Sequence, residues 1–259
     1  MVIEAAQAAR RNAHAGVQAV PAVFGIAVLA QVAYPLTSGA ARSALTIAIV
    51  LIVAAAALLH ALLSRGPRAV ITLAVVTVLG GFAVEVVGVH TGVPFGRYHY
   101  SDTLGAQLFG VPLVIAFAWS MLAWPAALAA RRLCRSFPAR VAVGAWALAA
   151  WDAFLDPQMV AAGHWTWADP SAHLPGVAHV PLTDYAGWLL VSLAISFGLQ
   201  SALRSLPDAD DRWPVAFYVW TWASSVLALA AFLDLGAAAL WGGLAMGVIA
   251  VPLARSALR

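Results

Sequence analysis

The stretch from Trp151 to Trp188 interrupts an otherwise apolar sequence with aspartates, histidines and tryptophans, and it includes side chains that could carry out acid–base chemistry. Asp152 and Asp156 stand four residues apart at the end of an apolar run, so a helix there would place both carboxyl groups on one face. Pro157 follows at once, and because proline interrupts helices we expect the helix to end before it. Two neighbouring carboxyl groups repel unless one is protonated or both are bridged. The pair therefore predicts a proton-transfer site.

Two predicted loops carry the remaining candidates. The loop over residues 157–183 is unusually long for a compact apolar protein, and the loop over residues 91–107 is rich in aromatic residues. Glu85 lies just before the shorter loop, inside an apolar segment, where an ionisable group is costly and usually faces a partner or a cavity. The candidates for substrate binding in and beside these loops are Arg97, Tyr98, Tyr100, His164, Trp165, Trp167, Asp184 and Trp188.

The composition determines which elements must position these residues. The chain has 259 residues, of which 63% are hydrophobic and 10% charged, whereas soluble domains carry about 25% charged residues. Apolar stretches long enough to cross a bilayer recur along the whole sequence. We therefore expect an all-α, polytopic transmembrane bundle that forms one integral-membrane domain over residues 1–259. About eight spans are predicted, or seven if the last two form one broken segment: 17–35, 43–63, 69–90, 108–130, 139–156, 184–203, 213–233 and 236–254.

The arginines predict the orientation. The chain has no lysine, and with eight spans twelve of its 14 arginines fall on one side, leaving only Arg42 and Arg97 on the other. Arginine collects on the cytoplasmic side of membrane proteins. We therefore expect a multi-pass protein of the cell membrane with both termini in the cytoplasm and a retained first helix. Both long loops should then lie on the extracytoplasmic side, and a single cavity should open toward that half of the membrane.

Several classes of function do not fit the sequence. The net charge of +3 comes from loop arginines and predicts no nucleic-acid partner. A retinal Schiff base needs a lysine, which is absent, and a single cysteine excludes an intrachain disulfide. The histidines match no metal-binding spacing, so neither a metal nor another cofactor is predicted. Other tryptophans, including Trp119 and Trp124, are interpreted as membrane-interface residues.

Three ordered motifs resemble those of a membrane family of carotenoid-biosynthesis proteins. They read GVPFGRYHYSDTLGAQLFGVPLVIAFAW, DAFLDPQMVAAGHWTW and VPLTDYAGW, and together they cover roughly residues 80–190. That family includes hydratases that act on gamma-carotene and on bacterioruberin precursors. The last motif more usually has an asparagine where this chain has Asp184. The resemblance implies addition of water to the terminal double bond of a linear, ψ-ended carotenoid dissolved in the lipid bilayer. It is also compatible with association with other carotenoid enzymes.

The residues suit that chemistry on their own terms. Protonation of such an alkene needs a strong acid in a dry site, and aromatic faces stabilise the resulting cation. We assign Asp152, the deeper residue of the acidic pair, as the proton donor and Asp156 as the residue that orients water. Glu85 is a partner or an alternative base, with Tyr98, Trp165 and Trp167 beside the cation.

Two other functions remain open at this point. An end-group cyclase or isomerase would share the first protonation and differ in how the cation is quenched. A non-catalytic carotenoid-binding protein would keep the aromatic cavity without requiring the acids. A prenyltransferase that binds diphosphate through magnesium is disfavoured, because only Arg97 lies with the acids to contact phosphate.

Overall fold

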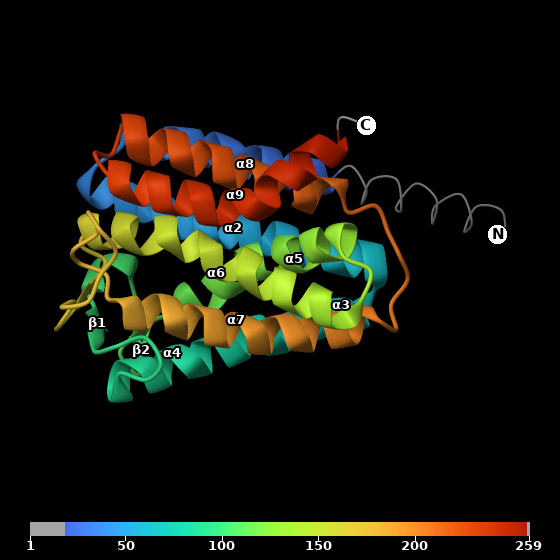
Figure 1. Ribbon diagram of the computed structural model, residues 1–259, viewed down its shortest axis with the longest axis horizontal. Coiled ribbons are helices and arrows are strands. Elements are labelled where there is room, and N and C mark those ends of the chain that lie inside the picture. The colour runs from blue at the N-terminus through green and yellow to red at the C-terminus, as the bar shows by residue number, and fades with distance from the viewer. Residues whose placement is uncertain (1–18, 258–259) are drawn as a thin grey trace, which may run out of the picture.

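The computed structural model describes residues 19–257 and shows eight long helices packed side by side in a bundle (Figure 1). Arg10, Arg11, Arg259 and the first two residues of the first predicted span lie outside the described residues. The first helix, called here the N-terminal helix, is described from Ala19 to Leu36. The others are α2 (Gly39–Arg65), the continuous run of α3 (Pro67–Leu73), the π-helical turn η2 (Ala74–Leu79) and α4 (Gly80–Thr91), then α5 (Ile115–Leu133), α6 (Phe137–Ala161), α7 (Leu182–Leu203), α8 (Arg212–Ala231) and α9 (Gly236–Ala257).

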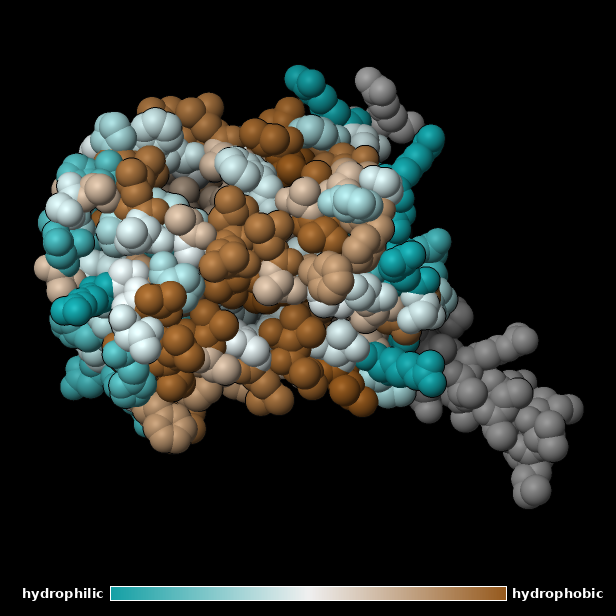
Figure 2. Space-filling model, turned by 60° about the horizontal axis from the view of Figure 1, so that its bottom comes forward, coloured by the Kyte–Doolittle hydropathy of each residue, from teal (hydrophilic) through white to brown (hydrophobic). Residues whose placement is uncertain are grey.

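The bundle has the length and surface of a membrane protein. Six of the eight helices are long and apolar enough to cross a bilayer, all except α5 and α6. Those two occupy the middle, where α5 packs on α2, α6 and α8, and α6 packs on α5, α7 and α9. Figure 2 shows hydrophobic side chains across the middle of one face and hydrophilic ones at both ends. The predicted all-α polytopic bundle is confirmed.

The two long loops meet at one end of the bundle and form a small sheet. Strand β1 (Tyr98–Tyr100) pairs antiparallel with β4 (Trp165–Trp167), with Tyr98 opposite Trp167 and Tyr100 opposite Trp165. Side chains alternate between the two faces of a strand. The tyrosines and tryptophans therefore turn inward, while His99 and Thr166 are exposed and hydrogen-bonded to each other at 3.1 Å.

Two predicted helix boundaries are wrong. Helix α6 continues through Pro157 to Ala161, because a proline removes only one backbone hydrogen bond and the packing of α6 on three neighbouring helices outweighs that loss. The fourth span begins at Ile115 rather than at residue 108. Residues 107–112 instead form a hairpin of β2 (Gln107–Leu108) and β3 (Val111–Pro112), whose two-residue turn has positive φ at both positions and contains a glycine.

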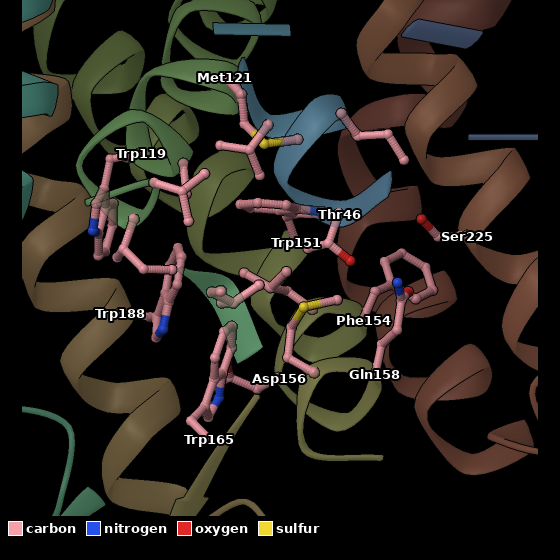
Figure 3. A pocket seen from close by; sticks show the side chains of 18 of the residues that line it. Thr46, Trp119, Met121, Trp151, Phe154, Asp156, Gln158, Trp165, Trp188 and Ser225 are labelled. Atoms are coloured by element: carbon pink, nitrogen blue, oxygen red, sulfur yellow. The ribbon is translucent and has the colours of Figure 1, made fainter. Parts of the chain in front are cut away.

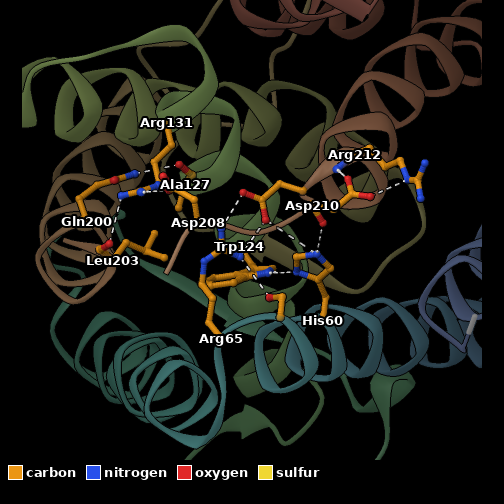
Figure 4. Close-up of polar contacts among 12 residues, drawn as sticks. His60, Arg65, Trp124, Ala127, Arg131, Gln200, Leu203, Asp208, Asp210 and Arg212 are labelled. Atoms are coloured by element: carbon orange, nitrogen blue, oxygen red, sulfur yellow. Dashed lines mark hydrogen bonds and ion pairs between the residues drawn. The ribbon is translucent and has the colours of Figure 1, made fainter. Parts of the chain in front are cut away.

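The opposite end of the bundle carries most of the arginines. There Arg65 binds Asp211 through two hydrogen bonds of 2.8 and 2.7 Å, and Arg131 contacts Asp208 at 2.8 Å (Figure 4). The buried Trp124 donates to His60 Nδ1 at 3.0 Å, which leaves His60 Nε2 to donate to the Asp210 carbonyl at 3.1 Å. Trp124 is therefore a core residue and not the interfacial residue that the sequence suggested. Together these contacts hold the α7–α8 loop onto α2 and α5.

The orientation in the membrane stays a prediction, and the α5–α6 connection gives a direct test. Ser136, at this arginine-rich end, and Ser171, in the long loop at the other end, are both exposed. In a Cys134→Ser background, Ser171→Cys should react with a membrane-impermeant maleimide in intact cells, whereas Ser136→Cys should react only after permeabilisation. The reverse labelling pattern would show that the termini face outward.

Candidate functional site

A cavity of about 1220 Å³, counted with the space at its open side, lies at the end of the bundle that carries the long loops. Most of the residues selected from the sequence line it. They are Glu85, Tyr98, Tyr100, Asp156, Trp165, Trp167, Asp184 and Trp188. The helices α4, α6 and α7 supply the acids, and the small β1–β4 sheet supplies the two tyrosines and two of the tryptophans. Residues that lie far apart in the sequence therefore share one wall.

Three aspartates form the acidic centre of the site. Asp152 and Asp156 lie on α6 and Asp184 in the first turn of α7, and each offers a carboxylate oxygen within 4.8 Å of the others. All three are at most 2% exposed. Both oxygens of Asp152 and one oxygen of each of the other two have no hydrogen-bond donor among the described residues. Such an arrangement needs protons or a cation shared between the acids, because three carboxylates so close together in a buried site repel strongly.

Glu85 has the opposite environment. Its Oε2 accepts hydrogen bonds from the Tyr98 hydroxyl at 2.5 Å and the Tyr100 hydroxyl at 2.8 Å, and its Oε1 accepts one from Trp119 Nε1 at 3.1 Å. Burial, and then the charge of Glu85, raise the pKa of both tyrosines above the usual value, so their hydroxyls stay protonated and donate. Three donors around an acceptor stabilise the carboxylate form. Glu85 is thus a buried acceptor of three hydrogen bonds, whereas four of the aspartate oxygens have no donor within residues 19–257.

An aromatic wall faces the acids (Figure 3). Trp119 and Trp188 stack with ring centroids 4.1 Å apart, and Trp151 meets Trp188 edge to face at 6.0 Å. Tyr100 packs edge to face on Trp165 at 5.5 Å. Such π faces attract a cation, and their rings exclude bulk water. The wall therefore suits a substrate that is apolar at rest and positively charged during reaction.

Two glycines of α4 make room for this wall. A Cβ atom on Gly81 would lie 2.5 Å from the Trp119 ring, and one on Gly88 would lie 2.8 Å from the Tyr98 hydroxyl. Neither distance is possible without displacement of the aromatic side chain. The close approach of α4 therefore sets the positions of two of the three donors to Glu85.

Three of the predicted site residues do not line the cavity. Asp152 lies behind Asp156 in the acid cluster and is fully buried. His164 is also buried, and its Nδ1 pairs with the Thr103 hydroxyl at 2.8 Å, so that it joins the two loops; burial lowers its pKa. Arg97 is exposed. Any effect of these three residues on catalysis or substrate binding is therefore exerted through neighbouring residues.

The sequence interpretation missed several cavity residues. Trp119 was interpreted as a membrane-interface residue but is buried, donates to Glu85 and stacks on Trp188. Trp151 also lines the cavity, although it lies in an apolar run with nothing to distinguish it from a packing residue. The one available signal for Trp151 was its spacing of four residues from Leu155, which precedes Asp156. Apolar residues recur at that spacing in every buried helix, so the signal does not distinguish a cavity residue from a packing residue.

The three aspartates are also the residues that could hold a metal ion in the described part of the chain. Three carboxylates form a hard, oxygen-only donor set, which fits Mg²⁺, Mn²⁺ or Ca²⁺ better than a softer metal. Shared protons would satisfy the same oxygens. Protons and a divalent cation are therefore two chemically distinct ways to neutralise one cluster.

The fold and the site together define a polytopic membrane protein with an acidic cluster beside a cavity walled by aromatic residues. The chain belongs to the carotenoid biosynthesis protein family, whose model matches residues 43–252. Among curated proteins it resembles a bisanhydrobacterioruberin hydratase from Haloarcula japonica, with 32% identity over 178 residues. That match covers 63% of this chain and 58% of the relative, so the chain spans well under two thirds of the relative's length. No solved structure matches the chain.

The donors around Glu85 predict a stability difference between two variants. Glu85→Leu leaves two phenol hydroxyls and an indole N–H without their acceptor, at a cost of about 1–3 kcal/mol for each buried donor. Glu85→Gln keeps a carbonyl oxygen and should cost clearly less. Thermal unfolding in detergent should therefore rank wild type first, Glu85→Gln second and Glu85→Leu last. Equal melting temperatures for the two variants would contradict the hydrogen-bond geometry.

Proposed function

We propose that this protein hydrates the terminal double bond of a linear, ψ-ended carotenoid by acid catalysis. The observation that carries the proposal is the juxtaposition of three buried carboxyl groups with an aromatic-walled cavity inside a membrane protein. Family membership and the hydratase name of the relative from Haloarcula japonica support it. A carotenoid is apolar and membrane-dissolved, and it matches a cavity lined largely by apolar and aromatic side chains between membrane-spanning helices.

Protonation is the first step. The alkene takes a proton at its terminal CH carbon, the C–C π bond breaks, and the positive charge appears on the tertiary carbon. Asp156 and Asp184 are the two acids of the cluster that are buried and also line the cavity. We assign the donation to Asp156, because the resembling motif more usually has asparagine at the position of Asp184. This assignment differs from the sequence-based choice of Asp152, which lies behind Asp156 and would instead resupply the proton.

The aromatic wall then stabilises the cation. The stacked Trp119–Trp188 pair and Trp165 present π faces to the same cavity as Asp156 (Figure 3). A cation over an aromatic ring is stabilised by about 2 kcal/mol or more when water is excluded. Glu85 adds a negative charge beside Trp119, held there by its three donors.

Water completes the addition. Its oxygen bonds to the tertiary carbon, and the proton released from the resulting oxonium returns to a carboxylate of the cluster. The sum is one alkene plus one water giving one tertiary alcohol, with the acids returned to their initial state. The proposal also places the protein in the cell membrane, beside the enzymes that supply its carotenoid.

The acid assignment predicts different results for two neighbouring variants. Asp156→Asn removes the proton from the cavity wall and should lower hydration by about 100-fold or more. Asp184→Asn should stay active, because an amide can donate to the other two acids and the resembling motif more usually has asparagine there. Mass spectrometry of pigments from cells that make lycopene measures both, as the gain of one water. If Asp156→Asn hydrates normally, another acid is the donor.

Removal of metal ions by a chelator distinguishes shared protons from a bound divalent cation as the means of neutralising the three aspartates. In the proposed mechanism the acids share protons, so purified protein treated with EDTA should hydrate its carotenoid at the untreated rate. A loss of activity that Mg²⁺ or Mn²⁺ restores would assign the aspartates to a metal instead. An unhydrated product of unchanged mass from wild type would indicate a cyclase or isomerase.

A further inference from the structure

The cavity has a second, polar side that the protonation step does not use. Its wall also includes Thr46 of α2, beside Trp151, and Ser225 of α8, across from Trp119 and Trp188 (Figure 3). The N-terminal helix adds Gln31 and Tyr34. We call these four residues the polar arm. None of them is charged, so this side of the cavity suits a neutral hydrogen-bonding ligand.

The sequence of the N-terminal helix changes character where it reaches the cavity. Its buried stripe begins with Val20, Phe24 and Ala27, and Gln31 and Tyr34 continue it at the same spacing of three and four residues. The opposite face is apolar and exposed, as expected for a helix in contact with lipid. Polar side chains thus replace apolar ones in the buried stripe, at the point where the stripe meets the cavity.

The polar arm has unused hydrogen-bonding capacity. Tyr34 is 6% exposed, yet its hydroxyl has no partner among the described residues. Gln31 Oε1 accepts from Trp220 Nε1 at 2.8 Å, which leaves the amide N–H groups of Gln31 free of any hydrogen bond within residues 19–257. Thr46 donates to the Arg42 carbonyl at 3.0 Å and keeps its acceptor lone pairs. A buried donor without an acceptor is costly, above all inside a membrane, so the Tyr34 hydroxyl in particular favours a polar ligand at this side of the cavity.

We infer that the polar arm binds the water molecule that attacks the carotenoid cation. This inference rests on the proposed hydration. A buried water needs two to four polar partners, and the arm offers both donors and acceptors. Thr46 and Ser225 lie about 10 Å along their helices from the end that carries the long loops, which is within reach of external water. An apolar carotenoid fills the rest of the cavity, so the reacting water needs a site of its own.

Quenching of the cation can be measured separately from formation of the cation. The cation either bonds to water and forms the alcohol, or loses a proton from a neighbouring carbon and becomes an alkene again. In D₂O the cluster donates a deuteron, so the second route leaves deuterium in a carotenoid that has gained no water. The amount of deuterium in unhydrated carotenoid therefore measures how many cations formed and lost a proton without being attacked by water.

The test compares Tyr34→Phe and Ser225→Ala, singly and together, with wild type in D₂O on lycopene in detergent or liposomes. We expect the double variant to make at least about tenfold less alcohol, while deuterium in the unhydrated carotenoid is maintained or rises. Tyr218→Phe is the matched control, because that hydroxyl is buried against the Ala147 carbonyl, away from the cavity, and should leave the product ratio unchanged.

Three results would overturn the inference. Alcohol and deuterium incorporation could fall together, which would give the arm a role in binding the carotenoid or in folding. Alcohol formation could stay unchanged, which would remove the arm from the reaction. A loss limited to carotenoids that already carry a hydroxyl group would assign the arm to that substrate oxygen. Failure of the proposed function itself looks different, because wild type would then form no alcohol from lycopene: deuterium in an unhydrated product would indicate a cyclase or isomerase, and no deuterium would indicate no protonation.

Discussion

The structure depends on the cost of placing carboxyl groups where water and counter-ions are scarce. Within residues 19–257 every arginine–aspartate ion pair lies at the arginine-rich end and involves Asp208, Asp210 or Asp211. Asp152, Asp156 and Asp184 receive no such partner, although their oxygens lie within 4.8 Å of one another. The fold thus pairs the acids that hold loops in place and leaves unpaired those that face the cavity. An acid that must give a proton to a carbon atom needs that isolation.

Sequence spacing predicted much of this arrangement, because some signals are local. The i, i+4 pair of Asp152 and Asp156 does lie on one helix, and hydropathy predicted the eight helices. The strand pairing of Tyr98–Tyr100 with Trp165–Trp167 was not predicted. Each segment has only three residues, and alternation over three residues does not distinguish a strand from an aromatic loop.

The boundary errors and the missed residues share a physical origin in tertiary packing. Pro157 continues a helix because α6 is held on three sides, and no local signal contains that information. Trp119 and Trp124 were interpreted as interfacial because a tryptophan near a span end is usually there. Each is buried because a distant residue accepts its N–H, Glu85 in one case and His60 in the other. Long-range partners of this kind are invisible in a single sequence.

The division of the cavity into two walls bears on what determines the reaction. An acid cluster and an aromatic wall are enough to make a tertiary cation, and a cyclase or an isomerase needs both as much as a hydratase does. What separates the three reactions is the nucleophile or base that meets the cation next. In this protein Tyr34, Gln31 and Ser225 add uncharged hydrogen-bonding groups to the same cavity. Ser225 lies across it from Trp119 and Trp188 (Figure 3). The N-terminal helix and α8, which carry none of the acids, would then determine which product forms. Protonation and product choice could therefore change independently.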